Sequence, residues 1–371
     1  MKISILTSVF FQKCKEVDGE DRIIFGGAER YLIELCKFLQ ADGHEVKVYQ
    51  ACRGEQMLYK EYAGISIQCL PVQDKWELHV APRLNQAFYE LSLGADLRIY
   101  FASFLCWPTV KAPAISINHG IFWDYPEYLV RHVSPTQKEM FYERQIYGMT
   151  AVDACVAVDT NVRGVLAALR PGEERKITVI PNFVDTDQFK PAEERPWDKL
   201  RILYPRRITP LRGINEFLLA AQALPEFEFI TCGQAFNQDA EAMLEKAGAA
   251  MNIRQTHRPM EEMAEIYKEA DIAIIPTRAA EGTSLSCLEA MAAGLPVITT
   301  PAGGLPNLII DRWNGRVVDI NNENLTDTIK ELANDTASRL VYGHRNREMV
   351  EECFSLEVWK DRWRKLLNRI L

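Results

Sequence analysis

Two glutamates separated by seven residues, Glu281 and Glu289, are the side chains of this sequence best suited to hold a polar ligand. Glu281 follows residues 271–276, an apolar run ended by a proline, which predicts a buried parallel strand and then a loop. Glu289 lies in residues 285–293, whose leucine, alanine and methionine content predicts a helix that stops at Gly294. In such strand–loop–helix units, ligands bind at the carboxyl end of the strand, where free helix N–H groups favour a phosphate.

A purely structural interpretation fits the same residues. Ser286 and Glu289 have the spacing of a capping box, in which two side chains satisfy the first N–H groups of a helix. Glu281 suits a solvated loop charge equally well. Because a single motif is weak evidence, the pair alone does not decide between the two interpretations.

Three arginines form a basic loop earlier in the same half of the chain. Arg206, Arg207 and Arg212 follow a strand predicted for residues 201–204 and precede a helix predicted to start at Ile214. Guanidinium groups match the oxygens of a diphosphate, and the adjacent helix N-terminus adds to the positive field. The alternative is a set of solvated surface charges.

The amino-terminal half begins with a predicted strand at residues 2–6, a long polar loop to residue 25, and the pair Gly26-Gly27. Apolar positions between residues 28 and 39 then fall on one helix face. This βαβ start predicts an α/β fold with a doubly wound parallel sheet. The glycine pair would let a ligand approach the backbone closely, or would simply turn the chain.

His119 follows a strand predicted for residues 114–118. Active sites of parallel sheets form at such strand ends, although a lone histidine is more often structural than catalytic. The aromatic segment 122–128 suits either a wall on which a sugar stacks or an ordinary surface hairpin.

Composition narrows the class of protein. A length of 371 residues predicts two domains. The net charge of -8 is spread over both halves without a basic stripe, so nucleic acid is not an expected partner. Nine scattered cysteines, without a Cys-x-x-Cys pair, indicate reduced thiols and a cytoplasmic protein. We expect no signal peptide, and the longest apolar run, residues 99–107, is too short to cross a membrane.

Asp185 and Asp187 are the carboxylate pair most similar to a metal site. They lie in an irregular, proline-bearing segment at residues 181–199 instead of at a strand end. We therefore predict no bound metal and no cofactor.

Together these features resemble glycosyltransferase family 4, whose members are retaining enzymes of the GT-B fold, with two Rossmann-like, doubly wound parallel-sheet domains facing a cleft. The resemblance covers nearly the whole chain. Its landmarks are Gly26-Gly-Ala-Glu29, Gly43-His-Glu-Val46, His119, Ile180-Pro-Asn-Phe-Val-Asp185, Arg207, Arg212-Gly213, Glu281-x7-Glu289 and Asn314-Gly315.

The resemblance implies an acceptor-binding domain at residues 1–185, a linker at 186–200, a nucleotide-sugar-binding domain at 201–353, and a last helix at 354–371 that crosses back to the first domain. Acceptor recognition would lie in the first domain, in loops such as residues 7–25 and 76–84.

The resemblance also implies roles for individual residues. Glu281 and His119 would be catalytic, Glu281 beside the transferred sugar and His119 near its 6-hydroxyl. Glu289 would bind the ribose, while Arg207 and Arg212 would bind the diphosphate, with Arg212 replacing a lysine of the family. The full donor-binding set is Gly27, Arg207, Arg212, Gly282, Thr283, Ser284, Leu285 and Glu289.

The implied function is metal-independent transfer of a sugar, with retention, from a UDP- or GDP-sugar to an acceptor hydroxyl in polysaccharide, lipopolysaccharide or glycolipid biosynthesis. Expected partners are the nucleotide-sugar donor and a sugar, glycan or lipid-linked acceptor. The expected location is the cytoplasm, with peripheral contact to the inner face of the membrane left open. The alternatives are a GT-B nucleotide-sugar epimerase and a catalytically silent nucleotide-sugar-binding subunit.

Overall fold

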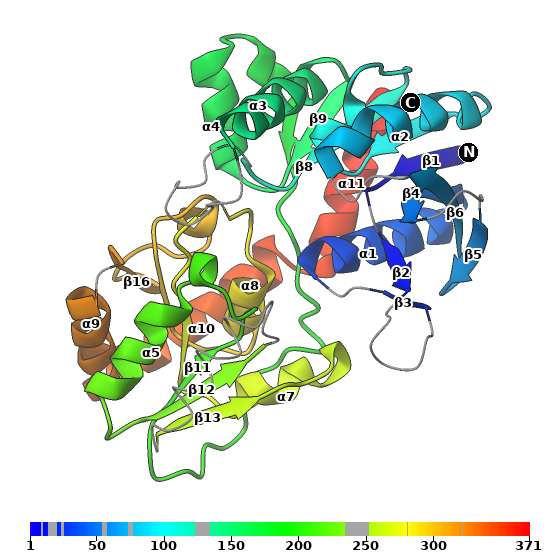
Figure 1. The fold of residues 1–371 in the computed structure, drawn as a ribbon. Coiled ribbons are helices and arrows are strands. Elements are labelled where there is room, and N and C mark those ends of the chain that lie inside the picture. Colours follow the sequence, from blue (N-terminus) through cyan, green and yellow to red (C-terminus); the bar gives the residue numbers. More distant parts are fainter. Residues whose placement is uncertain are drawn as a thin grey trace. The chain divides into compact units, whose positions relative to one another are not determined.

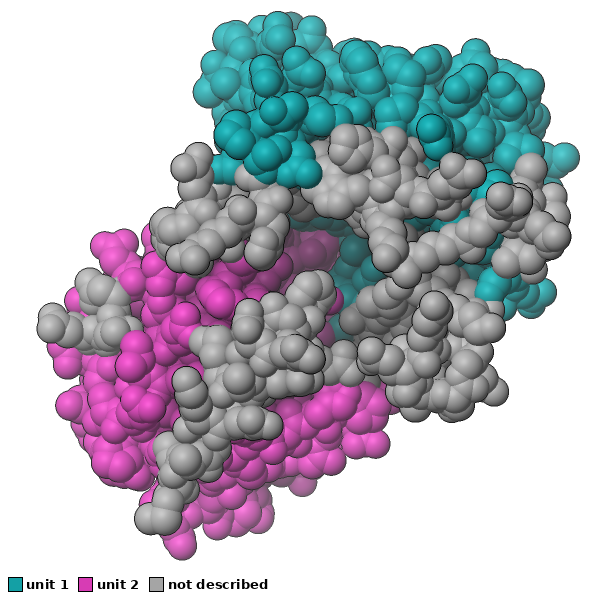
Figure 2. All heavy atoms as spheres, viewed as in Figure 1, with its two compact units in different colours: residues 1–123, 131–180, 362–371 teal, residues 124–130, 181–361 magenta. Residues whose placement is uncertain are grey.

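The computed structural model describes residues 1–8, 10–13, 21–23, 26–53, 58–72, 77–121, 123, 134–233, 252–279, 281–320 and 322–371. These residues form two compact units, coloured separately in Figure 2. Unit 1 holds the described residues up to Ile180 together with Arg362–Leu371, and unit 2 holds those from Pro181 to Asp361. The prediction for an α/β fold is confirmed in each unit, because each is built on its own, mainly parallel sheet.

Unit 1 contains an eight-stranded sheet, most of whose strands are labelled in Figure 1. The strand order is β10-β9-β8-β7-β1-β4-β6-β5. Neighbouring strands are parallel except for β5, which runs antiparallel to β6 at one edge. In β1, Ile3 pairs with Val46 on one side and with Leu97 on the other. The strands are β1 (Lys2–Leu6), β4 (Glu45–Arg53), β5 (Leu58–Tyr62), β6 (Ile65–Val72), β7 (Leu97–Tyr100), β8 (Ala114–Asn118), β9 (Ala154–Ala157) and β10 (Ile177–Val179).

The helices of unit 1 pack against its sheet through their buried residues, and the first helix buries a clear apolar face. In the first of them, Leu32, Leu35, Cys36 and Leu39 are buried, as the sequence periodicity predicts. A small hairpin pairs β2 (Phe11–Lys13) with β3 (Asp21–Ile23). The helices are α1 (Gly27–Ala41), α2 (Glu77–Leu91), α3 (Pro135–Thr150) and α4 (Thr160–Leu169), with the short 3-10 helices η1 (Ser103–Cys106) and η3 (Glu173–Lys176).

Unit 2 contains a fully parallel six-stranded sheet with the order β13-β12-β11-β14-β15-β16. In β14, Ile272 and Ile274 enter one apolar cluster, whereas Ala273 and Ile275 enter another. Since successive side chains of a strand point to opposite faces, both faces of this sheet are covered, which explains the uninterrupted apolar run in the sequence. The strands are β11 (Arg201–Tyr204), β12 (Glu228–Cys232), β13 (Ile253–Thr256), β14 (Ile272–Ile275), β15 (Val297–Thr299) and β16 (Gly315–Val317).

The helices that belong wholly to unit 2 are α5 (Ile214–Ala223), α7 (Met263–Lys268), α8 (Leu285–Ala292), α9 (Asn322–Asn334) and α10 (Thr336–Cys353), with the 3-10 helices η4 (Pro210–Arg212), η5 (Met260–Glu262) and η6 (Leu305–Asn307). The predicted linker at residues 186–200 lies within this unit, where Trp197 donates its indole N–H to Asp271 at 2.7 Å.

The last helix, α11 (Leu356–Ile370), contributes to both units. In unit 2, Trp359 packs on Phe183 with ring centroids 4.6 Å apart. In unit 1, the indole N–H of Trp363 donates to the hydroxyl of Tyr31 at 3.0 Å, and Arg364 forms an ion pair with Asp42.

One predicted loop, residues 76–84, is wrong, because α2 begins at Glu77 and includes a proline at position 82. The sequence also predicts a helix at residues 239–249, which lies outside the described residues, as do most of the aromatic segment 122–128 and much of the loop to residue 25. Within the described part of the chain, no helix combines the length and hydropathy that a membrane span needs.

Candidate active site

The candidate site of unit 2 is formed by two loops at one edge of its sheet. Residues 205–213 follow β11, and residues 276–284 follow β14. The two strands are parallel neighbours, with Ile202 beside Ile272 and Leu203 beside Ala273. Because the carboxyl ends of parallel strands meet at the same edge, the arginines of the first loop reach the glutamate of the second.

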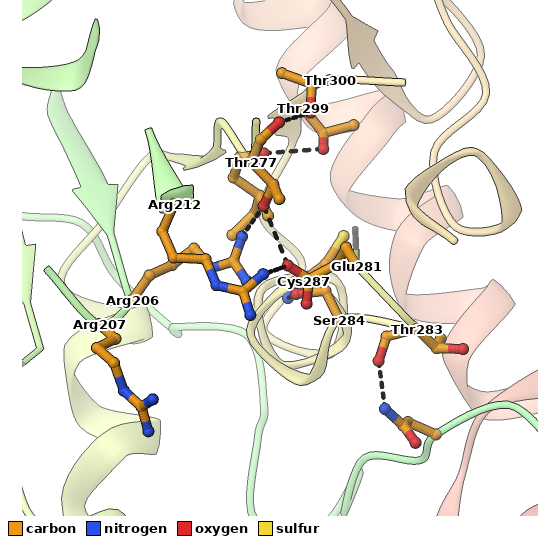
Figure 3. A network of polar contacts seen from close by, with 12 residues as sticks. Arg206, Arg207, Arg212, Thr277, Glu281, Thr283, Ser284, Cys287, Thr299 and Thr300 are labelled. Carbon is orange, nitrogen blue, oxygen red and sulfur yellow. Dashed lines mark hydrogen bonds and ion pairs between the residues drawn. The ribbon is translucent and has the colours of Figure 1, made fainter. Parts of the chain in front are cut away.

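Glu281 is the centre of a polar network (Figure 3). Its Oε2 atom accepts hydrogen bonds from Arg206 Nη2 at 2.6 Å, from Arg212 Nη1, and from the Thr277 hydroxyl at 3.2 Å. The Glu281 side chain is 11% exposed, that of Arg206 6% and that of Arg212 32%. Since all three bonds end on one oxygen and none to Oε1 is found among the described residues, Oε1 is left to accept from a ligand.

Electrostatics keep this carboxylate ionised. Burial by itself would raise the pKa of Glu281, but the adjacent guanidinium groups of Arg206 and Arg212, together with the hydrogen bonds from Arg206 and Thr277, lower it below its usual value. Burial likewise opposes the charge of Arg206, yet Glu281 raises the pKa of Arg206. A buried charge is tolerated here because it is paired.

Tyr204, the last residue of β11, holds the loop of residues 205–213 in place. Its buried hydroxyl contacts the carbonyl oxygens of Arg207 and Arg212 at 3.1 and 3.2 Å. Gly213 has φ +78°, and a Cβ atom there would lie 1.9 Å from the Pro276 carbonyl oxygen. The two loops are therefore so close that only glycine fits at this position.

A third loop, after β15, holds the backbone of Glu281. The Gly304 N–H donates to the Glu281 carbonyl at 2.8 Å. Gly303 has φ +53°, and a Cβ atom on it would lie 2.0 Å from the same carbonyl oxygen. The position of Glu281 thus depends on strands β11, β14 and β15 together.

Helix α8 begins at a different cap from the one that the sequence pattern suggested. Ser284 is its N-cap, and the Ser284 hydroxyl accepts from the Cys287 N–H at 3.4 Å. The capping box of Ser286 with Glu289 is therefore wrong, because Ser286 already lies inside the helix. Glu289 is buried one turn further along, where its Oε2 accepts from the Tyr267 hydroxyl at 2.7 Å.

The four residues predicted to offer backbone N–H groups lead into α8. Gly282 is partly buried, the side chains of Thr283 and Ser284 are buried, and Leu285 is the first helical residue. The Thr283 carbonyl accepts from the side-chain amide of Asn182. Because the first N–H groups of a helix have no partner within it, this end of α8 offers donors to an anion.

The three arginines of the basic loop differ in position. Arg206 and Arg212 point at Glu281 in Figure 3, whereas Arg207 is exposed and points away from the network. The sequence places Arg206 in the basic loop, but the family resemblance implies Arg207 and Arg212, and not Arg206, as the residues that bind the diphosphate. Thr277 and Tyr267 were not selected either, because no local pattern marks a hydroxyl that contacts a carboxylate distant in the sequence.

His119 and Gly27 lie in unit 1. His119 Nε2 is 3.0 Å from the Phe101 carbonyl oxygen, and the rings of Tyr31 and Phe101 flank the imidazole. Burial lowers the pKa of His119 to about 4, and the hydrogen bond to Phe101 opposes this only in part. Since a carbonyl only accepts, Nε2 carries the proton and Nδ1 is an acceptor. Gly27 is exposed at the first turn of α1.

Asp185 does not behave as a metal ligand in the structure. Its Oδ1 atom accepts from the backbone N–H groups of Asp187 and Gln188 at 2.9 and 3.1 Å, which is a turn-stabilising role. In the part of the chain that the structure describes, no three His, Cys, Asp or Glu side chains gather in an arrangement suited to a metal ion. The absence of a metal requirement stays a prediction.

Comparison with known families matches both halves of the chain. Residues 25–188 match Glycosyltransferase Family 4, and residues 185–349 match Glycosyl transferases group 1. The chain belongs to glycosyltransferase family 4. Two curated members are D-inositol 3-phosphate glycosyltransferases: that of Segniliparus rotundus is 29% identical over 216 residues, and that of Xylanimonas cellulosilytica 29% identical over 209 residues.

These matches cover 53% and 50% of this glycosyltransferase-family chain, and 45% and 49% of the two relatives. The chain thus spans about half the length of the curated relatives it matches. Among solved structures, sucrose-phosphate synthase from Thermosynechococcus elongatus has a TM-score of 0.79 at 16% identity, covering 99% of this chain and 98% of that one.

The structure of HepE from Anabaena in complex with UDP-glucose gives a TM-score of 0.76 at 16% identity, with both chains covered completely. At these identities the similarity establishes the fold, which is GT-B. The predicted fold class is therefore confirmed.

Proposed function

We propose that this protein is a retaining glycosyltransferase that transfers a sugar from a nucleotide diphosphate sugar to an acceptor hydroxyl. The observation that carries the proposal is the ionised Glu281 carboxylate held by Arg206 and Arg212 at the carboxyl ends of β11 and β14. A fixed negative charge beside positive charges suits a reaction in which a sugar becomes cationic while its leaving group becomes anionic.

The proposed chemistry follows from these charges. The bond between sugar C1 and the diphosphate oxygen breaks with its electron pair going to the diphosphate. The oxygen of the acceptor hydroxyl then bonds to C1 on the same face, and its proton passes to the leaving phosphate oxygen. Arg212, Arg207 and the first N–H groups of α8 would stabilise the diphosphate, and Glu281 the cationic sugar.

Within the donor, we assign Glu281 Oε1 to the sugar hydroxyls, because Oε2 already has three protein donors. Glu289, oriented by Tyr267, is proposed to accept from the ribose hydroxyls. The roles implied for His119 and Gly27 stay predictions. The UDP-glucose in the HepE structure favours a UDP-sugar as the first donor to test, with GDP-sugars second.

The acceptor is proposed to be a sugar, glycan or lipid-linked molecule bound mainly by unit 1. The biosynthetic setting proposed is that of a polysaccharide, lipopolysaccharide or glycolipid. Cytoplasmic location and peripheral membrane contact also stay predictions.

The first experiment measures thermal unfolding in the presence of UDP-, GDP-, ADP- and dTDP-sugars, because a ligand that binds only the folded state stabilises it. The matching donor should raise the unfolding temperature and then release nucleotide in the presence of an acceptor. Interconversion of the donor without acceptor would identify an epimerase, and binding without any nucleotide release would identify a silent subunit.

The second experiment tests Glu281 itself. Glu281→Gln keeps the size of the side chain but removes its charge, so we expect turnover to fall roughly 100-fold or more while the donor Kd changes far less. Glu265→Gln, an exposed carboxylate on α7, is the control. Unchanged turnover with lost nucleotide binding would refute the role given to Glu281.

A further inference from the structure

The two arginines on Glu281 differ in ways that suggest different tasks. Arg206 is almost completely buried, whereas about a third of the Arg212 side chain is exposed, at 32%. Both donate to the same oxygen, Oε2 of Glu281. One guanidinium group would suffice to neutralise one carboxylate, so the second needs an explanation.

Arg206 is held at both ends of its guanidinium group. Nη2 donates to Glu281, and Nη1 donates to the Thr277 hydroxyl. Thr277 is itself fixed, because its carbonyl oxygen accepts from the Thr300 hydroxyl at 2.6 Å. A Cβ atom on Gly233 would lie 1.9 Å from the Arg206 carbonyl oxygen, so the backbone there is enclosed as well. Arg206 therefore cannot turn toward a ligand without breaking this packing.

Among the described residues, Glu281 and the charged groups that contact it sum to a surplus of one positive charge. Arg206 and Arg212 face it from the arginine loop. The other titratable neighbours are Tyr204 from β11 and Cys287 from α8, and burial raises the pKa of each, so both are neutral at physiological pH. An approaching diphosphate would thus attract Arg212, the more exposed cation.

If Arg212 were the sole partner of Glu281, turning it toward a phosphate would leave an unpaired carboxylate in a nearly buried position. Removing one member of a buried ion pair is strongly unfavourable for that reason. With Arg206 in place, the carboxylate keeps a charged partner and a fixed orientation while Arg212 turns.

We propose that Arg206 is a positioning residue that keeps Glu281 paired and oriented, and thereby frees Arg212 to bind the diphosphate of the donor. This inference rests on the proposed function. A lysine should not replace Arg206, because a single ammonium cannot reproduce the planar fork that spans Thr277 and Glu281.

The test is a double-mutant cycle on the binding of UDP, or of whichever nucleoside diphosphate the wild type binds. In Arg206→Lys and Arg206→Gln, Glu281 should retain Arg212, and the Kd should rise about tenfold, or roughly 1.4 kcal/mol. In a Glu281→Gln background the same substitutions should change the Kd less than twofold, because a neutral amide does not retain Arg212. Arg312→Gln, an exposed arginine at 65%, is the matched control.

A pH profile of kcat provides the second measurement. Because Arg206 lowers the pKa of Glu281, Arg206→Gln should move the acidic limb of kcat to higher pH. Thr277→Val, which removes a hydroxyl but no charge, should give a smaller change of Kd in the same direction. This variant provides the test if the Arg206 variants do not fold.

Equal Kd changes with and without Glu281→Gln, or an acidic limb that does not move, would make Arg206 merely structural and overturn the inference. Failure of the wild type and Arg312→Gln to bind any nucleoside diphosphate would instead overturn the proposed function, and this inference with it.

Discussion

Replacing Gly303 by alanine should inactivate the site although no charged residue is substituted. Gly303 has φ +53°, and its new Cβ atom would lie 2.0 Å from the Glu281 carbonyl oxygen and 2.7 Å from the Glu281 nitrogen. Real Cβ atoms are almost never found closer than 3.0 Å to another heavy atom, so the Glu281 backbone must move by about 1 Å. Both neighbours are backbone atoms, which cannot rotate away.

Two costs add up in this variant. A left-handed backbone at a non-glycine residue costs about 1–2 kcal/mol, and overpacking adds about 1–3 kcal/mol. We therefore expect the free energy of unfolding to fall by about 2–5 kcal/mol. A displacement of about 1 Å at a reacting group can lower turnover about 100-fold, so the folded fraction should also be nearly inactive.

Gly64→Ala separates the two costs. Gly64 has φ +76°, with nothing within 4 Å of its added Cβ atom, so this variant should lose only about 1–2 kcal/mol and keep full turnover. Urea unfolding gives the stability of both variants, and nucleotide release from the sugar nucleotide gives the turnover. Turnover of Gly303→Ala within twofold of Gly64→Ala would refute the claim that Gly303 positions Glu281.

Two further predictions concern Tyr267 and His119. Tyr267→Phe keeps the ring but removes the hydroxyl that contacts Glu289, so calorimetry should show about fivefold weaker binding of the nucleoside diphosphate; unchanged affinity would exclude this role. Because the pKa of His119 is lowered to about 4, the unfolded chain binds a proton more readily than the folded chain between pH 6.5 and 4. The free energy of unfolding should therefore decrease by at most about 3 kcal/mol as the pH is lowered through this range. An imidazole titration near pH 6.5 by NMR, or the same pH slope in His119→Gln, would contradict this.

The strands that the sequence predicted correctly carry a local signal. Residues 272–275 are apolar at every position because both sheet faces are covered. Strands β1 and β8 are also almost wholly buried, but each carries polar residues among its apolar ones, such as Ser4 and Ser116. Strands β13 and β16 were not predicted. Each is only three or four residues long with polar side chains, and each exists because a neighbouring strand pairs with it.

The site could be predicted in outline, since a glutamate after one strand and arginines after another identify the sheet edge. Which of Arg206 and Arg207 contacts Glu281 could not be predicted. Adjacent residues of a loop differ in direction through the path of the backbone, and here the Tyr204 hydroxyl and the close approach of Gly213 to Pro276 set that path. These contacts involve residues far apart in the sequence, which local patterns do not report.

Helix α11 determines when unit 1 can complete its folding during synthesis. Unit 1 includes Arg362–Leu371, a segment that a ribosome makes only after all of unit 2. Until then, Tyr31 lacks the indole of Trp363, and Asp42 lacks the guanidinium of Arg364. Part of the apolar surface of unit 1 therefore stays exposed while unit 2 is synthesised. During that time a chaperone that acts on nascent chains could bind this surface.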